Sequence, residues 1–121
     1  MLQPTTLVLG ASTKLDRYSY RAICMLREYG YSVAAAGSRA GRVADVTIHM
    51  QLSATLQLDT ITLYLNPSHQ KPYYDFILQL KPRRVIFNPG AENPELAALL
   101  LQNNITPIEA CTLVLLSTHQ Y

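Results

Sequence analysis

Leu7-Val8-Leu9-Gly10-Ala11-Ser12 is the stretch that decides the fold of this chain, and a helical pattern follows it from Ser19. A short apolar strand therefore runs into a turn of small residues, and a helix begins soon afterwards. α/β proteins build phosphate sites in this way, because small residues let backbone N–H groups approach the anion and the helix N-terminus adds partial positive charge. Lys14 and Arg17 lie within the same turn. The segment therefore predicts a nucleotide or cofactor pocket.

The same alternation of strands and helices continues along the chain. Short β-rich runs predict strands at residues 6–9, 32–36, 60–65, 84–87 and 105–109, with a weaker one at 46–50. Helical spacing predicts helices at residues 19–29, 66–80 and 93–102, and residues 111–116 form a short helix or an edge segment. Gly30 ends the first of these helices as its C-cap. This alternation predicts a Rossmann-like three-layer sandwich, with a mostly parallel five-stranded sheet and helices on both faces.

Four polar or glycine-rich loops follow the carboxyl ends of predicted strands. They are residues 10–19, 37–42, 66–69 and 88–92. Right-handed crossovers bring such loops to one edge of the sheet, where ligands bind near the point at which the strand order reverses. We therefore expect these four loops to surround one site.

Composition limits the class of protein. The 121 residues form a single domain, residues 1–121, and 49% of them are hydrophobic while 15% are charged, which excludes a disordered chain. The net charge of +2 is too small to indicate nucleic-acid binding. The first 42 residues are locally basic, as a site for a polyanionic small molecule requires. Their charged residues are Lys14, Arg17, Arg21, Arg27, Arg39 and Arg42 against Asp16 and Glu28.

The sequence shows no signal peptide and no apolar run long enough to span a membrane. Cys24 and Cys111 fit no metal-ligand spacing and suggest no disulfide framework. We therefore expect a cytoplasmic protein that has no metal and no contact with a membrane.

The ligand pattern differs from that of NAD-binding proteins. The next glycine after Gly10 is Gly30, so G-x-G-x-x-G is absent, and no acidic residue follows the second strand to hold a ribose diol. Gly37-Ser38-Arg39 stands there instead. An arginine at this position suits a ribose phosphate, which coenzyme A carries at the 3′ position and NADP at the 2′ position.

At these residues the chain resembles the small stand-alone CoA-binding domain proteins, which are related to the CoA-binding domain of succinyl-CoA synthetase. The resemblance rests on five segments in the family's order and covers almost the whole chain. They are Gly10-Ala11-Ser12, Asp16-Arg17-Tyr18-Ser19-Tyr20-Arg21, Glu28-Tyr29-Gly30-Tyr31-Ser32-Val33, Gly90-Ala91-Glu92-Asn93 and Glu109-Ala110-Cys111. The chain departs from the family after the second strand, where Ala36-Gly37-Ser38-Arg39 replaces Val-Asn-Pro-Lys; Arg39 can supply the charge of the family's lysine.

The resemblance implies a role for each part of the pocket. Gly10, Ala11 and Ser12 would contact the pyrophosphate, and Ser19 and Tyr20 would cap the first helix or touch phosphate oxygens. Further around the pocket, the adenine side would be lined by Asn66 and Pro67, and the wall near the pantetheine arm by Asn88, Pro89 and Gly90.

The sequence thus favours a domain that binds coenzyme A or an acyl-CoA without catalysing a reaction, as a carrier, sensor or regulatory module. No nucleophile–base set and no Walker motif is present. Two alternatives stay open: an NADP-dependent oxidoreductase with the nicotinamide near residues 88–92, and a ligand-free module for protein–protein assembly, which a homo-oligomer would fit.

Overall fold

The central sheet has seven strands in the order β3-β4-β2-β1-β5-β6-β7. The computed structural model describes residues 5–121, so residues 1–4 of the predicted domain lie outside it. All neighbouring strands are parallel except β3 and β4, which pair antiparallel. The strands are β1 (Thr5–Leu9), β2 (Ser32–Ala36), β3 (Gly41–Val43), β4 (Val46–His49), β5 (Thr60–Leu63), β6 (Arg84–Phe87) and β7 (Thr106–Glu109).

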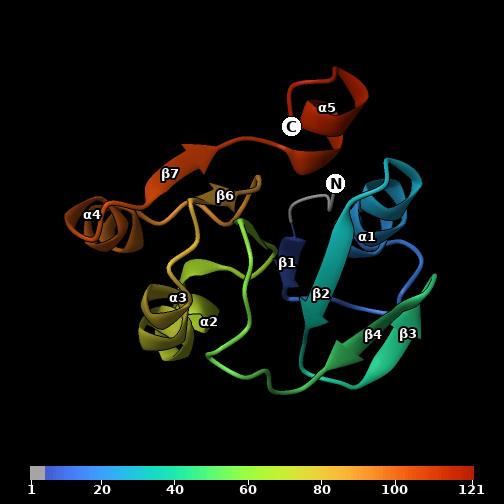
Figure 1. Ribbon diagram of the computed structural model, residues 1–121, viewed down its shortest axis with the longest axis horizontal. Helices are drawn as coiled ribbons and strands as arrows, with labels where there is room; N and C mark the ends of the chain where they lie inside the picture. The colour runs from blue at the N-terminus through green and yellow to red at the C-terminus, as the bar shows by residue number, and fades with distance from the viewer. Residues whose placement is uncertain (1–4) are drawn as a thin grey trace.

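Helices cover both faces of this sheet, which confirms the predicted three-layer arrangement (Figure 1). On one face Ile23 and Leu26 of α1 pack with Val8 and with Leu116 of α5. On the other face, side chains of α3 and α4 pack against Leu7 and Leu9. The helices are α1 (Tyr18–Glu28), α2 (Pro67–Gln70), α3 (Tyr74–Leu80), α4 (Pro94–Gln102) and α5 (Thr112–Ser117), with a 3₁₀ turn, η1 (Lys71–Tyr73), between α2 and α3.

Alternate residues of β1 face opposite cores, which explains its unbroken apolar sequence. β5 is likewise buried at all four positions, including its two threonines, Thr60 and Thr62. Its Thr62 is buried because its hydroxyl pairs at 2.8 Å with that of Thr112 on α5. A side-chain hydrogen bond therefore replaces water at this interior position.

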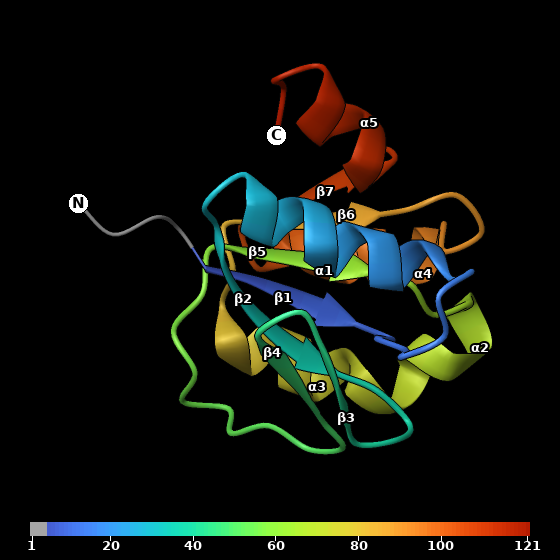
Figure 2. The same cartoon turned by 90° about the vertical axis from the view of Figure 1, so that its right-hand side faces the viewer.

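The prediction of five strands is wrong because a hairpin, β3–β4, extends the sheet beyond β2 (Figure 2). β3 falls partly in the predicted loop at residues 37–42. Its pairing with β4 turns at Ala44 and Asp45, and Ala44 has a φ of 53°. β4 corresponds to the weaker strand predicted at residues 46–50, but β3 was missed, because neither turn residue is the glycine or asparagine usual in such turns.

The helix predicted over residues 66–80 is three short segments, α2, η1 and α3. Pro72 lies in η1, and a proline inside a helix removes one N–H donor and clashes with the preceding turn. The first predicted helix is confirmed within one residue at each end. Its C-cap is Tyr29, and Gly30, the predicted C-cap, is the next residue, with a φ of 87°. Residues 112–117 form a helix, one of the two structures expected of the tail.

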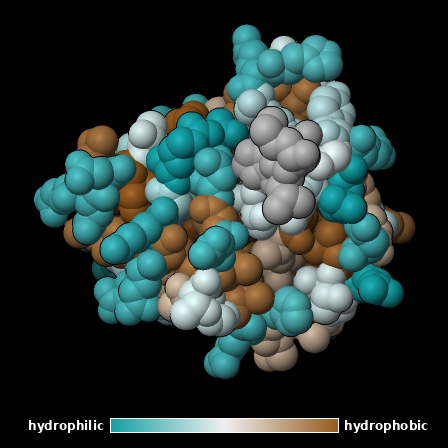
Figure 3. All heavy atoms as spheres, viewed as in Figure 1, coloured by the Kyte–Doolittle hydropathy of each residue, from teal (hydrophilic) through white to brown (hydrophobic). Residues whose placement is uncertain are grey.

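The exposed apolar side chains are spread over the surface. On the face shown in Figure 3, hydrophobic and hydrophilic residues are interspersed in small patches. The large exposed hydrophobic residues of the described chain belong to several different elements, so they do not mark a single site. They are Leu15, Tyr18, Tyr29, Met50, Leu101 and Val114.

Candidate functional site

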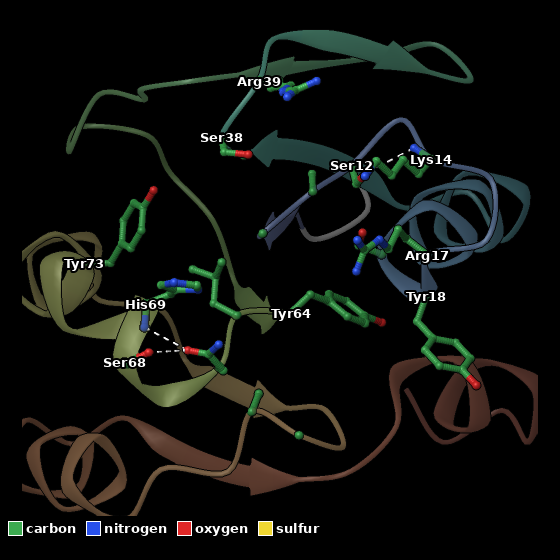
Figure 4. A pocket seen from close by; sticks show the side chains of 18 of the residues that line it. Ser12, Lys14, Arg17, Tyr18, Ser38, Arg39, Tyr64, Ser68, His69 and Tyr73 are labelled. Atoms are coloured by element: carbon green, nitrogen blue, oxygen red, sulfur yellow. Dashed lines mark hydrogen bonds between the residues drawn. The ribbon is translucent and has the colours of Figure 1, made fainter.

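A cavity of about 790 Å³ opens at the carboxyl ends of the central strands (Figure 4). The strand order reverses between β1 and β5, since β2 lies on one side of β1 and β5 on the other. The loops after both strands line the cavity, which therefore lies at the switch point where open α/β sheets bind ligands. Its volume is within the usual range of small-molecule sites.

Most of the predicted site residues line this cavity. These are Gly10, Ala11, Ser12, Lys14, Arg17, Ser19, Gly37, Ser38, Arg39, Asn66, Pro89 and Gly90. The remaining three, Tyr20, Pro67 and Asn88, do not. Tyr20 is a residue of α1 and packs against the core on that face of the sheet, and Pro67 is the first residue of α2.

The turn after β1 is fixed by its backbone. Gly10 has a φ of 94°, and an added Cβ would lie 2.9 Å from the carbonyl carbon of Tyr64. The N–H groups of Gly10 and Ala11 both donate to the Ala36 carbonyl oxygen at 2.9 Å. Glycine is therefore required at position 10 both by its backbone angle and by the close approach of the next loop.

The loop after β2 lies directly against this turn. A Cβ at Gly37 would overlap the carbonyl group of Ala11, and a Cβ at Gly41 would lie 2.5 Å from the Thr13 methyl. The two loops therefore touch backbone to backbone, and they hold Ser38 and Arg39 beside the turn. A ligand that contacts one loop meets the other as well.

The N-terminus of α1 points into the cavity without a side-chain cap. Arg17 is the N-cap residue and its side chain accepts no hydrogen bond, so the expected cap from Ser19 or Tyr20 is not formed. Ser19 is only 4% exposed, lines the cavity, and makes no side-chain hydrogen bond to residues 5–121. The first N–H groups of this eleven-residue helix and the Ser19 hydroxyl are thus donors that an anion can accept.

The charge of the lining is entirely positive. Lys14, Arg17 and Arg39 contribute side chains to it, and none of the lining residues is acidic. Within residues 5–121 these three cations form no ion pair, whereas Arg27 and Arg83 pair with Asp45 and Asp59 at 2.9 Å. Unpaired cations around a concave surface raise the local potential and attract anionic ligands.

The wall formed by α2 depends on two amide side chains. Asn66 Oδ1 accepts hydrogen bonds from the His69 N–H at 3.1 Å and the Ser68 hydroxyl at 2.7 Å, and so caps α2. Gln70 is fully buried, and its Nε2 donates at 2.7 Å to the carbonyl oxygens of Leu65 and Ala91. Gln70 therefore ties the loop after β5 to the loop after β6, on either side of the cavity.

Asn88 is turned away from the cavity into the protein. It is 2% exposed, and its Nδ2 donates to Thr62 Oγ1 at 2.6 Å and to the Leu63 carbonyl oxygen at 2.9 Å. Its Oδ1 accepts from the Thr112 N–H at 2.9 Å. Asn88 therefore connects β5 and the start of α5 to the end of β6 inside the protein. Of the residues 88–90, only Pro89 and Gly90 line the cavity.

Tyr64 lines the cavity and carries a buried hydroxyl. Burial is the main cause that raises the pKa of this hydroxyl to about 12. The Thr62 and Thr112 hydroxyls face it and oppose this rise, but neither lies in hydrogen-bonding geometry, and the Tyr64 hydroxyl has no partner within residues 5–121. An unpartnered buried hydroxyl is destabilising.

Several lining residues were not among those predicted individually. Thr13, Tyr18, Ser68, His69 and Ala91 lie inside the loops that the sequence pointed to. Tyr64, Leu65, Pro72 and Tyr73 lie in a predicted strand or helix, where the sequence offered no signal for a ligand. They reach the cavity because β5 ends at Leu63 and because Pro72 interrupts the helix.

Residues 5–121 hold neither a metal cluster nor a membrane-spanning helix. No group of three or more histidine, cysteine, aspartate and glutamate side chains is placed to hold a metal ion. No helix in this part of the chain is long and apolar enough to cross a membrane.

Comparison with known proteins gives one family and several structures. Residues 4–117 match the family described as CoA binding domain. A solved structure titled as an uncharacterized protein is 42% identical, with a TM-score of 0.95 and full coverage of both chains. A protein from Thermus thermophilus is 21% identical with a TM-score of 0.85, covering 98% of this chain and 91% of its own.

A hypothetical protein from Pyrococcus horikoshii is 18% identical, with a TM-score of 0.82, covering 90% of this chain and 78% of its own. At this identity, and at that of the Thermus protein, the likeness shows the fold alone. The curated proteins contain no significant match.

Proposed function

Because this chain belongs to the CoA-binding domain family, we propose that it binds coenzyme A or an acyl-CoA in the cavity at the switch point, without catalysing a reaction. The pyrophosphate lies against the turn at residues 10–12 and the N-terminus of α1. Backbone N–H groups, the Ser19 hydroxyl and the side chain of Arg17 are its donors. The protein then acts as a carrier, sensor or regulatory module for the cofactor.

The observation that carries this proposal is the uncapped N-terminus of α1. Its free N–H groups, an unpartnered Ser19 that is 4% exposed, and three unpaired cations, Lys14, Arg17 and Arg39, line one cavity. A helix N-terminus stabilises an anion through its N–H groups and its dipole together. Without an anion, these donors have only water to bond with.

Arg39 favours a ligand with a third phosphate. It lines the cavity on the loop after β2, which touches the phosphate turn. A ribose phosphate beside the pyrophosphate would lie within reach of this loop, as in coenzyme A. Arg39 would then distinguish coenzyme A from dephospho-coenzyme A.

The same arginine supports a second candidate, NADP, whose ribose phosphate is at the 2′ position. In that case the chain is an oxidoreductase, and the nicotinamide lies near Pro89 and Gly90. The two candidates differ in which ligand binds and in whether the chain catalyses hydride transfer between the cofactor and a substrate.

Isothermal titration of the purified, ligand-free chain with coenzyme A, dephospho-coenzyme A, NADP and ATP tests these proposals. We expect coenzyme A to bind most tightly, and Arg17→Gln to weaken it roughly ten- to a hundredfold, the loss expected for one charge-assisted hydrogen bond. Arg21→Gln is the matched control, because Arg21 is one turn further along α1 and does not line the cavity.

The pattern of binding decides between the candidates. Arg39→Gln should reduce the preference for coenzyme A over dephospho-coenzyme A. Arg42→Gln, three residues further on in β3 and outside the lining, should leave this preference unchanged. Tighter binding of NADP than of coenzyme A would favour the oxidoreductase. If none of the four ligands binds below millimolar concentration, the proposal is wrong, and a stable oligomer without ligand would favour the protein-assembly module.

A further inference from the structure

Gln70 is a buried polar residue that lies directly behind the cavity wall. It is the last residue of α2, is fully buried, and does not itself line the cavity. Its Nε2 donates at 2.7 Å to the carbonyl oxygens of Leu65 and Ala91, and both of these residues line the cavity. The two amide protons of Gln70 thereby hold two lining segments at a fixed separation.

The direction of this amide is set by Asn93, the N-cap residue of α4. Asn93 Nδ2 donates to Gln70 Oε1 at 2.9 Å, while Asn93 Oδ1 accepts from the Leu96 N–H at 3.2 Å. The same Nδ2 donates at 2.8 Å to the Tyr74 hydroxyl, which donates in turn to Glu95 at 3.0 Å. Because the helix cap uses the oxygen of Asn93, its NH2 group faces Gln70. The oxygen of Gln70 therefore faces Asn93, and its NH2 group faces the cavity wall.

Burial leaves these two amides with one favourable arrangement. Gln70 is 0% exposed and Asn93 is 6% exposed, so water is poorly placed to replace a lost hydrogen bond. An unpaired polar group at such a depth is costly. Gln70, Asn93 and Tyr74 do not line the cavity. A change in any of them therefore reaches a ligand only through the segments that they hold.

We propose that Gln70 is a positioning residue for the ligand and that Asn93 fixes the direction of its amide, an inference that rests on the proposed function. In this arrangement the loops after β5 and β6 present their lining residues to coenzyme A at one separation. A reversed Gln70 amide would direct its oxygen at two carbonyl oxygens. Three acceptors without a donor repel one another, so the loops move apart and the form that binds the ligand becomes rarer.

Asn93→Asp tests this by reversing the Gln70 amide while keeping the helix cap. Aspartate caps a helix as well as asparagine does, and its charge suits a helix N-terminus. Its second oxygen accepts instead of donating, so the NH2 group of Gln70 should turn towards it and leave the carbonyl groups of Leu65 and Ala91. In isothermal titration we expect coenzyme A to bind roughly three- to tenfold more weakly, the effect of about one net hydrogen bond.

Two control variants separate this effect from added charge and from lost stability. Asn93→Ser keeps a good cap and adds no charge, but its short side chain cannot reach Gln70, so coenzyme A should again bind several-fold more weakly. Ile48→Val lies on β4 in the core of the other face of the sheet, outside the cavity lining. It should lower the melting temperature by a few degrees and leave the affinity for coenzyme A unchanged.

Side-chain amide NMR provides a readout that a loss of stability alone would not change. In the wild-type chain the Gln70 NH2 protons should show cross-peaks to Leu65 and Ala91, with and without coenzyme A. In Asn93→Asp these cross-peaks should disappear and be replaced by contacts to position 93. The measurement on the wild-type chain needs no variant to fold, and missing cross-peaks to Leu65 and Ala91 there would overturn the inference.

The titrations separate this inference from the proposed function. If the wild-type chain binds coenzyme A and both variants at Asn93 bind it equally well, Gln70 does not position the ligand, while the proposed function stands. A loss confined to Asn93→Asp would assign the effect to charge, and an equal loss in Ile48→Val would assign it to stability; either overturns the inference. If the wild-type chain does not bind coenzyme A, the proposed function fails and this inference fails with it.

Discussion

Replacing Gly37 with alanine would force apart the two loops of the candidate phosphate site. The added Cβ would lie 3.1 Å from the Ala11 carbonyl carbon and closer still to its oxygen. This carbonyl belongs to the backbone of the turn, and the Ala11 N–H is bonded to Ala36 at 2.9 Å. The clash therefore cannot be relieved by rotating a side chain, and the turn or the β2 loop has to move.

The expected cost follows from two opposing effects. Gly37 does not have a left-handed φ, so alanine can adopt its backbone angles. Alanine would then stabilise the fold by about 0.4–1 kcal/mol, because it lowers the conformational entropy of the unfolded chain. Overpacking against a rigid neighbour typically costs about 1–3 kcal/mol. The clash prevails, and we expect a net loss of about 1–2 kcal/mol, which lowers the melting temperature by roughly 3–8 °C for a chain of this length.

Thermal unfolding and coenzyme A titration of matched variants provide the assay. At Gly41 the added Cβ would meet only the Thr13 methyl, so Thr13→Ser should rescue Gly41→Ala. No side-chain change should rescue Gly37→Ala, and its affinity for coenzyme A should fall with its melting temperature, since both loops line the cavity. A Gly37→Ala protein with wild-type affinity and an equal or higher melting temperature would refute the argument.

Three further predictions concern Asn88, Tyr64 and the ion pair of Arg83 with Asp59. Asn88→Ala should destabilise the chain by about 2–3 kcal/mol in urea unfolding, because it leaves the buried Thr112 N–H without its acceptor; a smaller loss than for an exposed asparagine such as Asn103 would contradict this. Tyr64→Phe should leave stability unchanged or raise it by up to about 1 kcal/mol, because the lost hydroxyl has no partner. Since the pKa of Tyr64 is raised to about 12, the folded state keeps its proton where the unfolded state has lost it, so this variant should also lose less stability between pH 10 and pH 12. The hydrogen bond from Arg83 lowers the pKa of Asp59, so the pair stabilises the fold at neutral pH and this contribution disappears as the pH falls through the lowered pKa. Urea unfolding of Asp59→Asn should show a weaker loss of stability below about pH 4 than the wild type, and identical acid profiles would rule the pair out as a cause.

The parts of the site that sequence reasoning found are those encoded by adjacent residues. The strand, the small-residue turn and the helix start are contiguous at residues 7–19, and each constrains the chain locally through glycine geometry or helix spacing. Gly30 is another such signal, since its position just after a helical pattern predicts the end of α1 within one residue: the C-cap is Tyr29, and Gly30 follows it with a φ of 87°. Local backbone rules are sufficient for elements of this kind.

What could not be predicted depends on contacts between distant segments. Asn88 stands in a turn motif, yet its side chain is directed inward because Thr62, Leu63 and Thr112 supply its partners. Gln70 is similar. Its amide binds Leu65 and Ala91, which are 26 residues apart in the chain but lie close together in space. A sequence pattern states neither which partners a polar residue will meet nor which way it will face.

The distribution of ion pairs shows where the protein leaves charge uncompensated. Arg27 joins α1 to the β3–β4 turn through Asp45, and Arg83 binds Asp59 at the opposite end of the sheet from the cavity. At the cavity, by contrast, Lys14, Arg17 and Arg39 share one concave surface with no acidic lining residue. Like charges held near a helix N-terminus repel one another and oppose the helix dipole, so this arrangement is unfavourable in the empty site. A ligand with several phosphates removes both penalties at once, whereas a neutral ligand removes neither. The charge pattern therefore selects for a polyanion before any contact with a base or an acyl group is made.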